Sequence, residues 1–216
     1  MRAFITAAVI LFAMISGPAH AASALIAAAE RGDAASVRGA IAAGAPLEER
    51  DERQRTALMA AVQGNHIEVA RLLIEAKADV NAKDNIQDSP YLLAGARGYL
   101  EILRLTLANG ADLRSTNRFG GTALIPACER GHVETVKALI EAGIDIDHVN
   151  RLGWTGLLEA IILSNGGPHH VEIVRLLIAA KANVNLPDRD GVSPLSHARQ
   201  RGYREIEQLL VAGGAR

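Results

Sequence analysis

Apolar positions along the chain fall into pairs of short stretches separated by polar turns. The first stretch of each pair is rich in alanine, and the second carries Leu, Ile and Val three to four residues apart, as in residues 67–74 and 171–178. This spacing puts the large side chains on one face of a helix. Glycine or a polar residue follows most stretches, at the positions where helices commonly end. The pattern therefore predicts an all-α protein made of short helix–turn–helix units.

A hydroxyl residue stands before the first helix of each unit and shows that the units repeat. Five of these residues follow one another at a spacing of 33, and the sixth comes 38 residues after the fifth, so the fifth unit carries five extra residues. We expect them to form a protruding loop from Leu163 to His169 between the two helices of that unit. Self-similarity at such a period is typical of a solenoid. The hydroxyl residues are Ser23, Thr56, Ser89, Thr122, Thr155 and Ser193. We count six units, which begin near residues 23, 51, 84, 117, 150 and 188.

Local signals mark the helix ends. Each hydroxyl can cap the following helix by accepting a hydrogen bond from a free backbone N–H. Pro90 and Pro194 stand at the first helical position, where a missing N–H costs little. Gly110 and Gly143 close second helices, and glycine suits the left-handed conformation of a C-cap. Lys77 and Lys181 fill the glycine slot of two second-helix caps, which we expect to be weaker or to have a different shape. Gln54 and Gln87 fill the glycine slot of two turns, where the local shape need not follow the repeat.

The second helix of a unit opens on a motif of the form Gly-His-x-Glu, which is complete at residues 131–134 and partial at His66 and His170. With this motif and a Thr-Pro-Leu-like start before the first helix, the repeat resembles the ankyrin repeat, a β-turn followed by two antiparallel helices. The resemblance implies an ankyrin-repeat solenoid of about six helix–turn–helix units with β-turn fingers over residues 22–216. It also implies that His66, His132 and His170 are structural and bond to neighbouring backbone. In the family's helix start, this chain replaces the His with other residue types.

The first 21 residues have the layout of a cleavable secretory signal. Arg2 precedes an apolar run of 13 residues, 3–15, and residues 19–21 form the small-x-small triplet Ala-His-Ala. The run is shorter than the roughly 20 residues that span a bilayer, which disfavours an uncleaved anchor. We therefore expect cleavage after Ala21 and a mature chain without a membrane span.

Charge and composition narrow the function. The chain has 23 Lys and Arg against 24 Asp and Glu, a net charge of −1, which excludes a strongly basic nucleic-acid binder. Cys128 is the sole cysteine, so a disulfide framework is excluded, and its place among alanines predicts a buried thiol. The repeat pattern brings together no nucleophile, base and orienting group, so we expect no enzyme and no cofactor. One alternative stays open, a metal site formed by His169, His170 and His197.

The turn tips and the first helices carry the candidate partner-binding residues. The third position of successive turns holds Arg53, Ile86, Phe119 and Leu152, so three consecutive tips are apolar. An exposed apolar row is uncommon unless a partner covers it, and aromatic and Arg residues are enriched at binding hot spots. The alternative is that the apolar tips pack on one another and stiffen the turns. The other candidates, beside the tips or on the exposed face of the first helix, are Arg97, Arg118, Glu129, Arg130, Arg151 and Trp154.

The sequence thus predicts a non-enzymatic, monomeric protein that binds another protein through its turn tips and concave helix face. Because the leader has a short apolar run and ends in Ala-His-Ala, we expect a bacterial periplasmic location. There the protein would modulate or protect a periplasmic protein. The alternative is a secreted effector that binds a host protein.

Overall fold

The computed structural model describes residues 18–216, with side chains described from Ala24 onward. This part of the chain forms twelve α-helices and no strand, which confirms the predicted all-α class. The helices are α1 (Pro18–Glu30), α2 (Ala34–Ala42), α3 (Ala57–Gln63), α4 (Ile67–Glu75), α5 (Pro90–Arg97), α6 (Leu100–Ala108), α7 (Leu124–Glu129), α8 (Val133–Glu141), α9 (Gly156–Ile162), α10 (Pro168–Ala179), α11 (Pro194–Arg201) and α12 (Arg204–Ala212).

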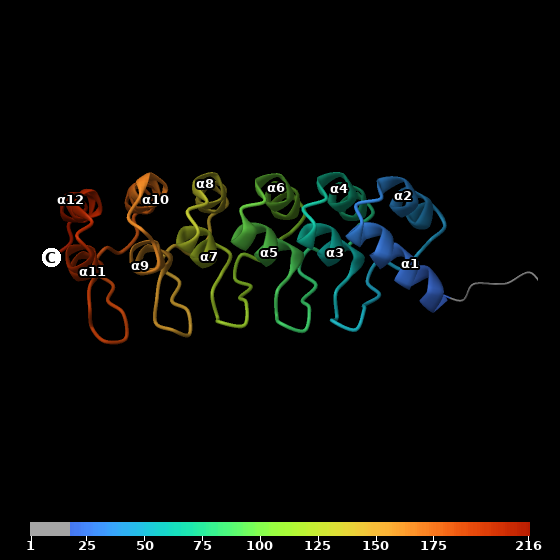
Figure 1. Ribbon diagram of the computed structural model, residues 1–216, viewed down its shortest axis with the longest axis horizontal. Coiled ribbons are helices and arrows are strands. Elements are labelled where there is room, and N and C mark those ends of the chain that lie inside the picture. The colour runs from blue at the N-terminus through green and yellow to red at the C-terminus, as the bar shows by residue number, and fades with distance from the viewer. Residues whose placement is uncertain (1–17) are drawn as a thin grey trace, which may run out of the picture.

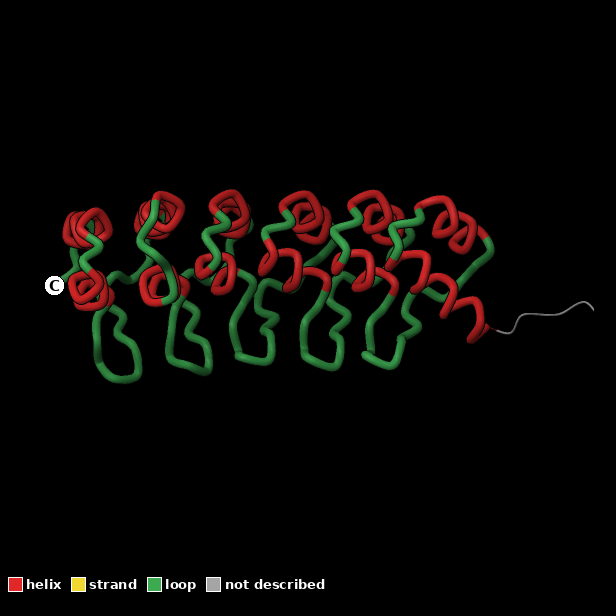
Figure 2. The backbone as a smooth tube through the Cα atoms, viewed as in Figure 1, coloured by secondary structure: helices red, strands yellow, loops and turns green. Residues whose placement is uncertain are grey.

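The helices form two parallel rows, with the even-numbered helices in one row and the odd-numbered helices in the other (Figure 1). Each odd-numbered helix packs on the next odd-numbered one and on the even-numbered helix that follows it. From α2 onward, long turns project from the side of the odd-numbered row and end in five tips (Figure 2). The molecule is therefore an elongated solenoid of six helix pairs, which we call units one to six.

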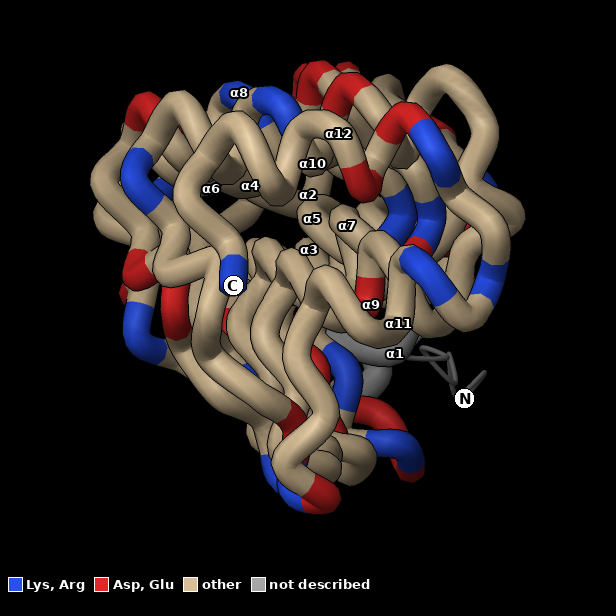
Figure 3. The backbone as a smooth tube through the Cα atoms, turned by 90° about the vertical axis from the view of Figure 1, so that its left-hand side faces the viewer, with Lys and Arg blue, Asp and Glu red and all other residues tan. Residues whose placement is uncertain are grey.

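A single apolar core runs between the two rows, from Leu25 in α1 to Leu210 in α12. The odd-numbered helices contribute small side chains such as Ala60, Ala94 and Cys128, each of which is fully buried. Small residues let the helices of one row approach closely, so the core needs few aromatic side chains. Charged residues lie around the outside of the solenoid and on the turns when it is viewed from the C-terminal end (Figure 3).

The predicted hydroxyl caps form in units two, three, five and six, where the hydroxyl oxygen accepts a hydrogen bond from the backbone N–H three residues on, at 3.2 Å in each case. The prediction is wrong for Thr122 in unit four. Its Oγ1 is buried and has no hydrogen-bond partner among the described residues, and α7 begins only at Leu124. Pro126 explains the difference. In the other units the backbone N–H at this position donates to the carbonyl of the capping residue, and proline has no N–H, so the first turn of α7 does not close on Thr122.

The residues that replace glycine keep the backbone shape of a glycine slot, contrary to our expectation of a different one. Gln54 and Gln87 have φ angles of 60° and 65°, close to the 72° of Gly120 in the equivalent turn. Lys77 and Lys181 have φ angles of 75° and 71°. With Asn65, whose φ is 54°, the repeat geometry imposes a left-handed conformation on five side-chain-bearing residues of the described part, at an energetic cost.

The five extra residues of unit five are more ordered than a protruding loop. Pro168 and His169 belong to the first turn of α10, so our placement of His169 in a loop is wrong; proline is favoured at the first position of a helix. The remaining residues pack against unit six, where the Tyr203 hydroxyl donates to the carbonyl of Ser164 at 2.7 Å. A side chain at Gly166 would collide with the Tyr203 ring. The extra segment thus joins units five and six.

The predicted leader lies mostly outside the described residues. Its last four residues, 18–21, fall in the first turn of α1, so cleavage after Ala21 would shorten that helix to residues 22–30. Leu25 and Ala29, which α1 contributes to the core, would remain. Over residues 18–216, every helix is too short or too polar to cross a bilayer.

Candidate functional site

The turns of units three, four and five meet the odd-numbered helices at an angle that encloses a pocket of about 350 Å³. We call it the concave pocket. It is built from equivalent positions of the three units: the third turn position, a position in the middle of the first helix, and the C-terminal end of that helix. These residues are Ile86, Phe119 and Leu152; Leu93, Pro126 and Glu159; and Arg97, Arg130 and Leu163.

The concave pocket brings together seven of the ten predicted partner-binding residues. The seven are Ile86, Arg97, Arg118, Phe119, Glu129, Arg130 and Leu152. The other three, Arg53, Arg151 and Trp154, are not among its lining residues. Arg53 lies on the tip of unit two, and Arg151 donates from Nη1 to the carbonyl of Arg118 at 2.9 Å. Trp154 is half-buried, and its backbone bonds to Asn150.

The three apolar tips are half-exposed, with exposed fractions of 45% for Ile86, 50% for Phe119 and 49% for Leu152. Neighbouring tips are joined by hydrogen bonds to backbone carbonyls: the Arg151 side chain donates to Arg118, and the Arg151 N–H donates to Phe119 at 2.9 Å. Asn85 donates in the same way to Arg53 at 3.1 Å. The turns are thus connected without burial of their apolar side chains, which argues against the interpretation that these side chains only stiffen the tips.

Two arginines of the pocket, Arg118 and Arg130, have partners within the chain. Arg118 lies 3.8 Å from the carboxylate of Asp88, and its guanidinium stands 4.6 Å from the centre of the Phe119 ring. Arg130 donates to the backbone carbonyl of Ala96. Burial raises the pKa of Asp88, and the nearby charge of Asp84 raises it further, while Arg118 acts in the opposite direction. These contacts tie Arg118 and Arg130 to unit three, while the charge of Arg130 still acts on Glu159 in unit five.

At the unit-five side lies a buried polar pair that our sequence analysis missed. Asn150, at the base of the turn, donates from Nδ2 to Oε1 of Glu159 in α9 at 2.8 Å. The two residues are 6% and 5% exposed. Burial raises the pKa of Glu159 to about 7, and the charge of Glu129 adds to the effect. The signal was present in the repeat alignment, because the units before it carry Ala60, Leu93 and Pro126 at the same position.

Comparison with known proteins decides the family. A model of ankyrin repeats in three copies matches residues 7–84 and 91–167, and a single ankyrin-repeat model matches residues 152–189. This chain belongs to the ankyrin-repeat family. Family membership supports a protein–protein interaction module as the general role of the fold.

Solved ankyrin-repeat structures agree with the fold. The chain is 61% identical to an ankyrin repeat domain from Acinetobacter baumannii AYE, with a TM-score of 0.87 over 89% of this chain and 98% of that one. It is 40% identical to the ankyrin repeat protein EF0377, with a TM-score of 0.85 over 88% and 97% of the two chains. A third similarity, to the ankyrin repeat protein YahD of Escherichia coli K12, is 50% identity over 58 residues, which span 27% of this chain and 29% of that relative.

Within this ankyrin-repeat chain, two of the three histidines at the second helix have the structural role that the resemblance implied. The His66 Nε2 atom lies 3.0 Å from the carbonyl oxygen of Glu30, and the His170 Nε2 atom lies 2.9 Å from that of Glu129. Each ring thus bonds to a carbonyl at the end of the preceding unit's first helix, where helical partners are lacking. His132 makes no such bond within the described residues, but its ring packs against Gly98.

The alternative of a metal site at the histidines finds no support in the geometry. The ring of His170 is bonded to Glu129, whereas the His197 Nε2 atom lies 2.7 Å from Asp188 in the turn of unit six. In residues 24–216, no three His, Cys, Asp or Glu side chains are placed to hold one ion. Cys128 is fully buried, as predicted, and burial raises the pKa of its thiol.

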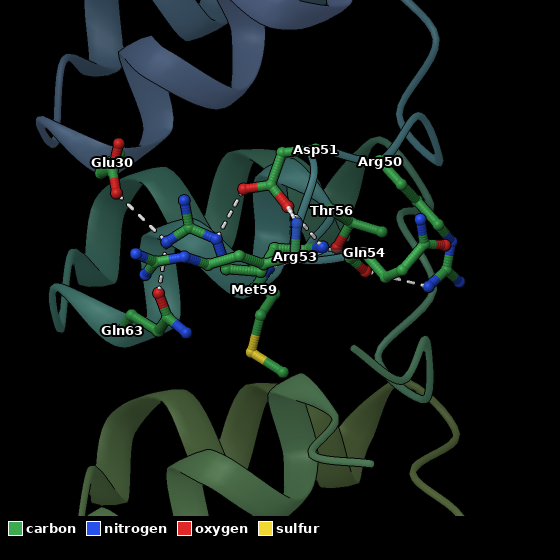
Figure 4. A network of polar contacts seen from close by, with 9 residues as sticks. Glu30, Arg50, Asp51, Arg53, Gln54, Thr56, Met59 and Gln63 are labelled. Atoms are coloured by element: carbon green, nitrogen blue, oxygen red, sulfur yellow. Dashed lines mark hydrogen bonds and ion pairs between the residues drawn. The ribbon is translucent and has the colours of Figure 1, made fainter. Parts of the chain in front are cut away.

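A network of polar contacts surrounds Arg55 in unit two, and its partners Glu30, Asp51 and Gln63 are labelled in Figure 4. The Arg55 guanidinium bonds to Asp51 at 2.7 Å, to Gln63 at 2.6 Å and to Glu30 at 3.1 Å. Arg55 is only 8% exposed, so it fills the angle between the turn and α3. The equivalent residues in units three and four are Asp88 and Gly121, which line the concave pocket instead. This difference places the pocket over the middle of the solenoid.

Proposed function

We propose that this ankyrin-repeat chain is a non-enzymatic protein-binding module that takes its partner in the concave pocket and on the tips around it. The half-exposed row of Ile86, Phe119 and Leu152 carries the proposal, because three apolar tips in succession border one pocket. Aromatic and Arg side chains at the centre of such a surface are typical binding hot spots. Burial of the tips by a partner would remove apolar area from water, which favours association.

Partner capture from a periplasmic extract tests this proposal. We expect the purified chain to retain a specific protein, and the double variant Phe119→Ala, Leu152→Ala to lose at least tenfold in retention. Both side chains are half-exposed, so the melting temperature of the variant should stay within a few degrees of the wild type. Asp190→Ala, at the equivalent tip of unit six and outside the pocket, is the matched control. Unchanged capture by the double variant would refute the proposed surface.

We further propose that the leader directs the protein to the periplasm, where it modulates or protects a protein of that compartment. The support is the layout of residues 1–21: one Arg, a short apolar run and the triplet Ala19-His20-Ala21. Osmotic-shock fractionation and intact-mass measurement test both parts. We expect a periplasmic species that starts at Ala22. A cytoplasmic species that retains residues 1–21 would contradict export, and recovery from the medium would favour the secreted-effector alternative.

A further inference from the structure

We propose that the concave pocket receives one lysine or arginine side chain of the partner protein, and that the carboxylate of Glu159 pairs with its cation. The inference rests on the proposed function, since it specifies what the partner presents to the same surface. Three observations carry it: the burial of Glu159, the absence of an ion pair to it within the described residues, and the apolar walls beside it.

Glu159 stands where the packing of the repeat does not require a carboxyl. The same position holds Leu93 in unit three and Pro126 in unit four, and both line the pocket as apolar residues. Glu159 is 5% exposed, and its Oε1 atom accepts a hydrogen bond from Asn150. Within the part of the chain that the structure describes, no donor bonds to its Oε2 atom. This oxygen is not among the fully buried side-chain atoms without a partner, so it is open to the pocket, where a cationic donor could bond to it.

The carboxyls at this side of the pocket form no ion pair within the described residues, although the charge of Arg130 lies near enough to lower the pKa of Glu159. Among residues 24–216, no Lys, Arg or His nitrogen lies within 4.0 Å of the carboxylate of Glu129 or Glu159. Of the arginines that line the pocket, Arg130 donates to the carbonyl of Ala96 and Arg118 pairs with Asp88. A cation from the partner would therefore meet two carboxyls that have no competing ion pair in the chain.

The shape of the pocket suits a long basic side chain. Its volume of about 350 Å³ falls in the range of ligand sites. Ile125, Leu152 and Leu163 line it together with Glu159, so they can contact the methylene stem while the cation reaches the carboxyl. The opposite side, with Arg97 and Arg118, disfavours a second basic residue. The preferred segment therefore carries one Lys or Arg with neutral or acidic neighbours.

Binding of a cation in the pocket is linked to loss of the proton that the Glu159 carboxyl carries at low pH. Burial and the charge of Glu129 raise the pKa of Glu159 to about 7, so the carboxyl is largely protonated at pH 6 and largely ionised at pH 8. The groups that face it are Asn150 from the turn, and Cys128, Glu129 and Arg130 from the end of α7. Binding of Lys or Arg should release the proton, so selectivity for a basic side chain should rise by about tenfold from pH 6 to pH 8.

A positional-scanning library of acetylated heptapeptides tests the inference on the full chain. We expect the wild type to enrich Lys and Arg over norleucine at one position by about tenfold or more at pH 8. Glu159→Leu, which installs the residue of unit three, should lose this enrichment and still select apolar residues through Phe119. Glu159→Gln should lose it as well, while Glu101→Gln, on the exposed side of α6, should keep it. Circular dichroism checks that each variant is folded.

A direct titration completes the test, with the best lysine peptide and its norleucine analogue measured by calorimetry at pH 6 and pH 8. Enrichment of Asp or Glu, retention of the basic preference in Glu159→Leu, or failure of the library to yield any peptide would each overturn the inference. A chain that selects apolar peptides through Phe119 without a basic preference would also overturn it. That last result would leave the proposed protein-binding surface standing, so the two proposals can fail separately.

Discussion

Glu159 adds a buried carboxyl to the concave pocket at a position that is Ala, Leu or Pro in the three preceding units. In an isolated helix the residue would be an ordinary exposed carboxyl. Its burial follows from the stacking of α9 on α7 and from the Asn150 turn that bonds to it. Alignment of the repeats within the chain shows that Glu159 is the unusual residue at its position. The shift of its pKa depends on packing against the neighbouring unit, so it could not be predicted from the sequence.

The raised pKa of Glu159 makes stability depend on pH in a defined window. Between about pH 4.5, where an unfolded Glu ionises, and about pH 7, the folded chain keeps a proton that the unfolded chain has lost. Stability should therefore fall as pH rises through this window and level off above it. Glu159→Gln keeps a hydrogen-bond acceptor for Asn150 and removes the titration. We expect it to be more stable than the wild type at pH 8, by up to about 3 kcal/mol.

Urea denaturation at pH 5, 6, 7 and 8 measures this difference. The gap between variant and wild type should widen with pH and then stay constant. Glu101→Gln, which removes an exposed carboxyl from α6, is the control. Parallel curves for Glu159→Gln and the wild type would show that Glu159 does not keep its proton in the folded chain.

The non-glycine residues with a left-handed backbone conformation give a second prediction at the residue scale. Lys77 has a φ of 75° and could be replaced by glycine, which adopts this conformation without the steric cost of a side chain. Lys77→Gly should stabilise the chain by about 0.5–1 kcal/mol, because the relief of strain exceeds the entropy that glycine adds to the unfolded state. Lys77→Ala should give no such gain, since alanine meets the same strain. Equal urea midpoints for the two variants would contradict this explanation.

At the scale of the element, the helices and their ends were largely predictable because their signals are local. A hydroxyl followed by an Ala-rich stretch gave four caps correctly, and the apolar spacing identified the second helices. Two predictions failed where a neighbour intervened. Pro126 removed the N–H that completes the first turn of α7, and the extra residues of unit five extended α10 instead of forming a free loop.

Pro126→Ala should restore the missing turn. In units two and three the amides of Ala60 and Leu93 donate to the carbonyl of the capping residue at 3.0 and 2.9 Å, and the new amide at position 126 could do the same to Thr122. We expect a gain of roughly 1 kcal/mol and slow hydrogen exchange at the new amide, measured by NMR. Pro90→Ala, at a first helical position that needs no N–H, should bring no gain. Destabilisation by Pro126→Ala would show that the proline ring contributes more than the lost bond.

At the scale of the whole molecule, the 33-residue period was sufficient to predict the solenoid, since each unit packs mainly on its neighbours. The period also indicated which tips and first-helix residues share a face. It could not show that these residues enclose a pocket over units three to five. In unit two the Arg55 side chain fills the space between the turn and α3, and this contact depends on the three-dimensional packing. Nor could it separate Arg53, Arg151 and Trp154 from the pocket residues, since all share the repeat register.

Site-specific photo-cross-linking tests the central claim most directly, namely that a protein partner occupies the concave pocket. A photoreactive phenylalanine analogue would replace Phe119 in the pocket, and Glu134 on the exposed side of α8 in a matched chain. After irradiation in a periplasmic extract, the account predicts one strong cross-linked protein from position 119 and none from position 134. Cross-linking from position 134 with none from position 119 would contradict it.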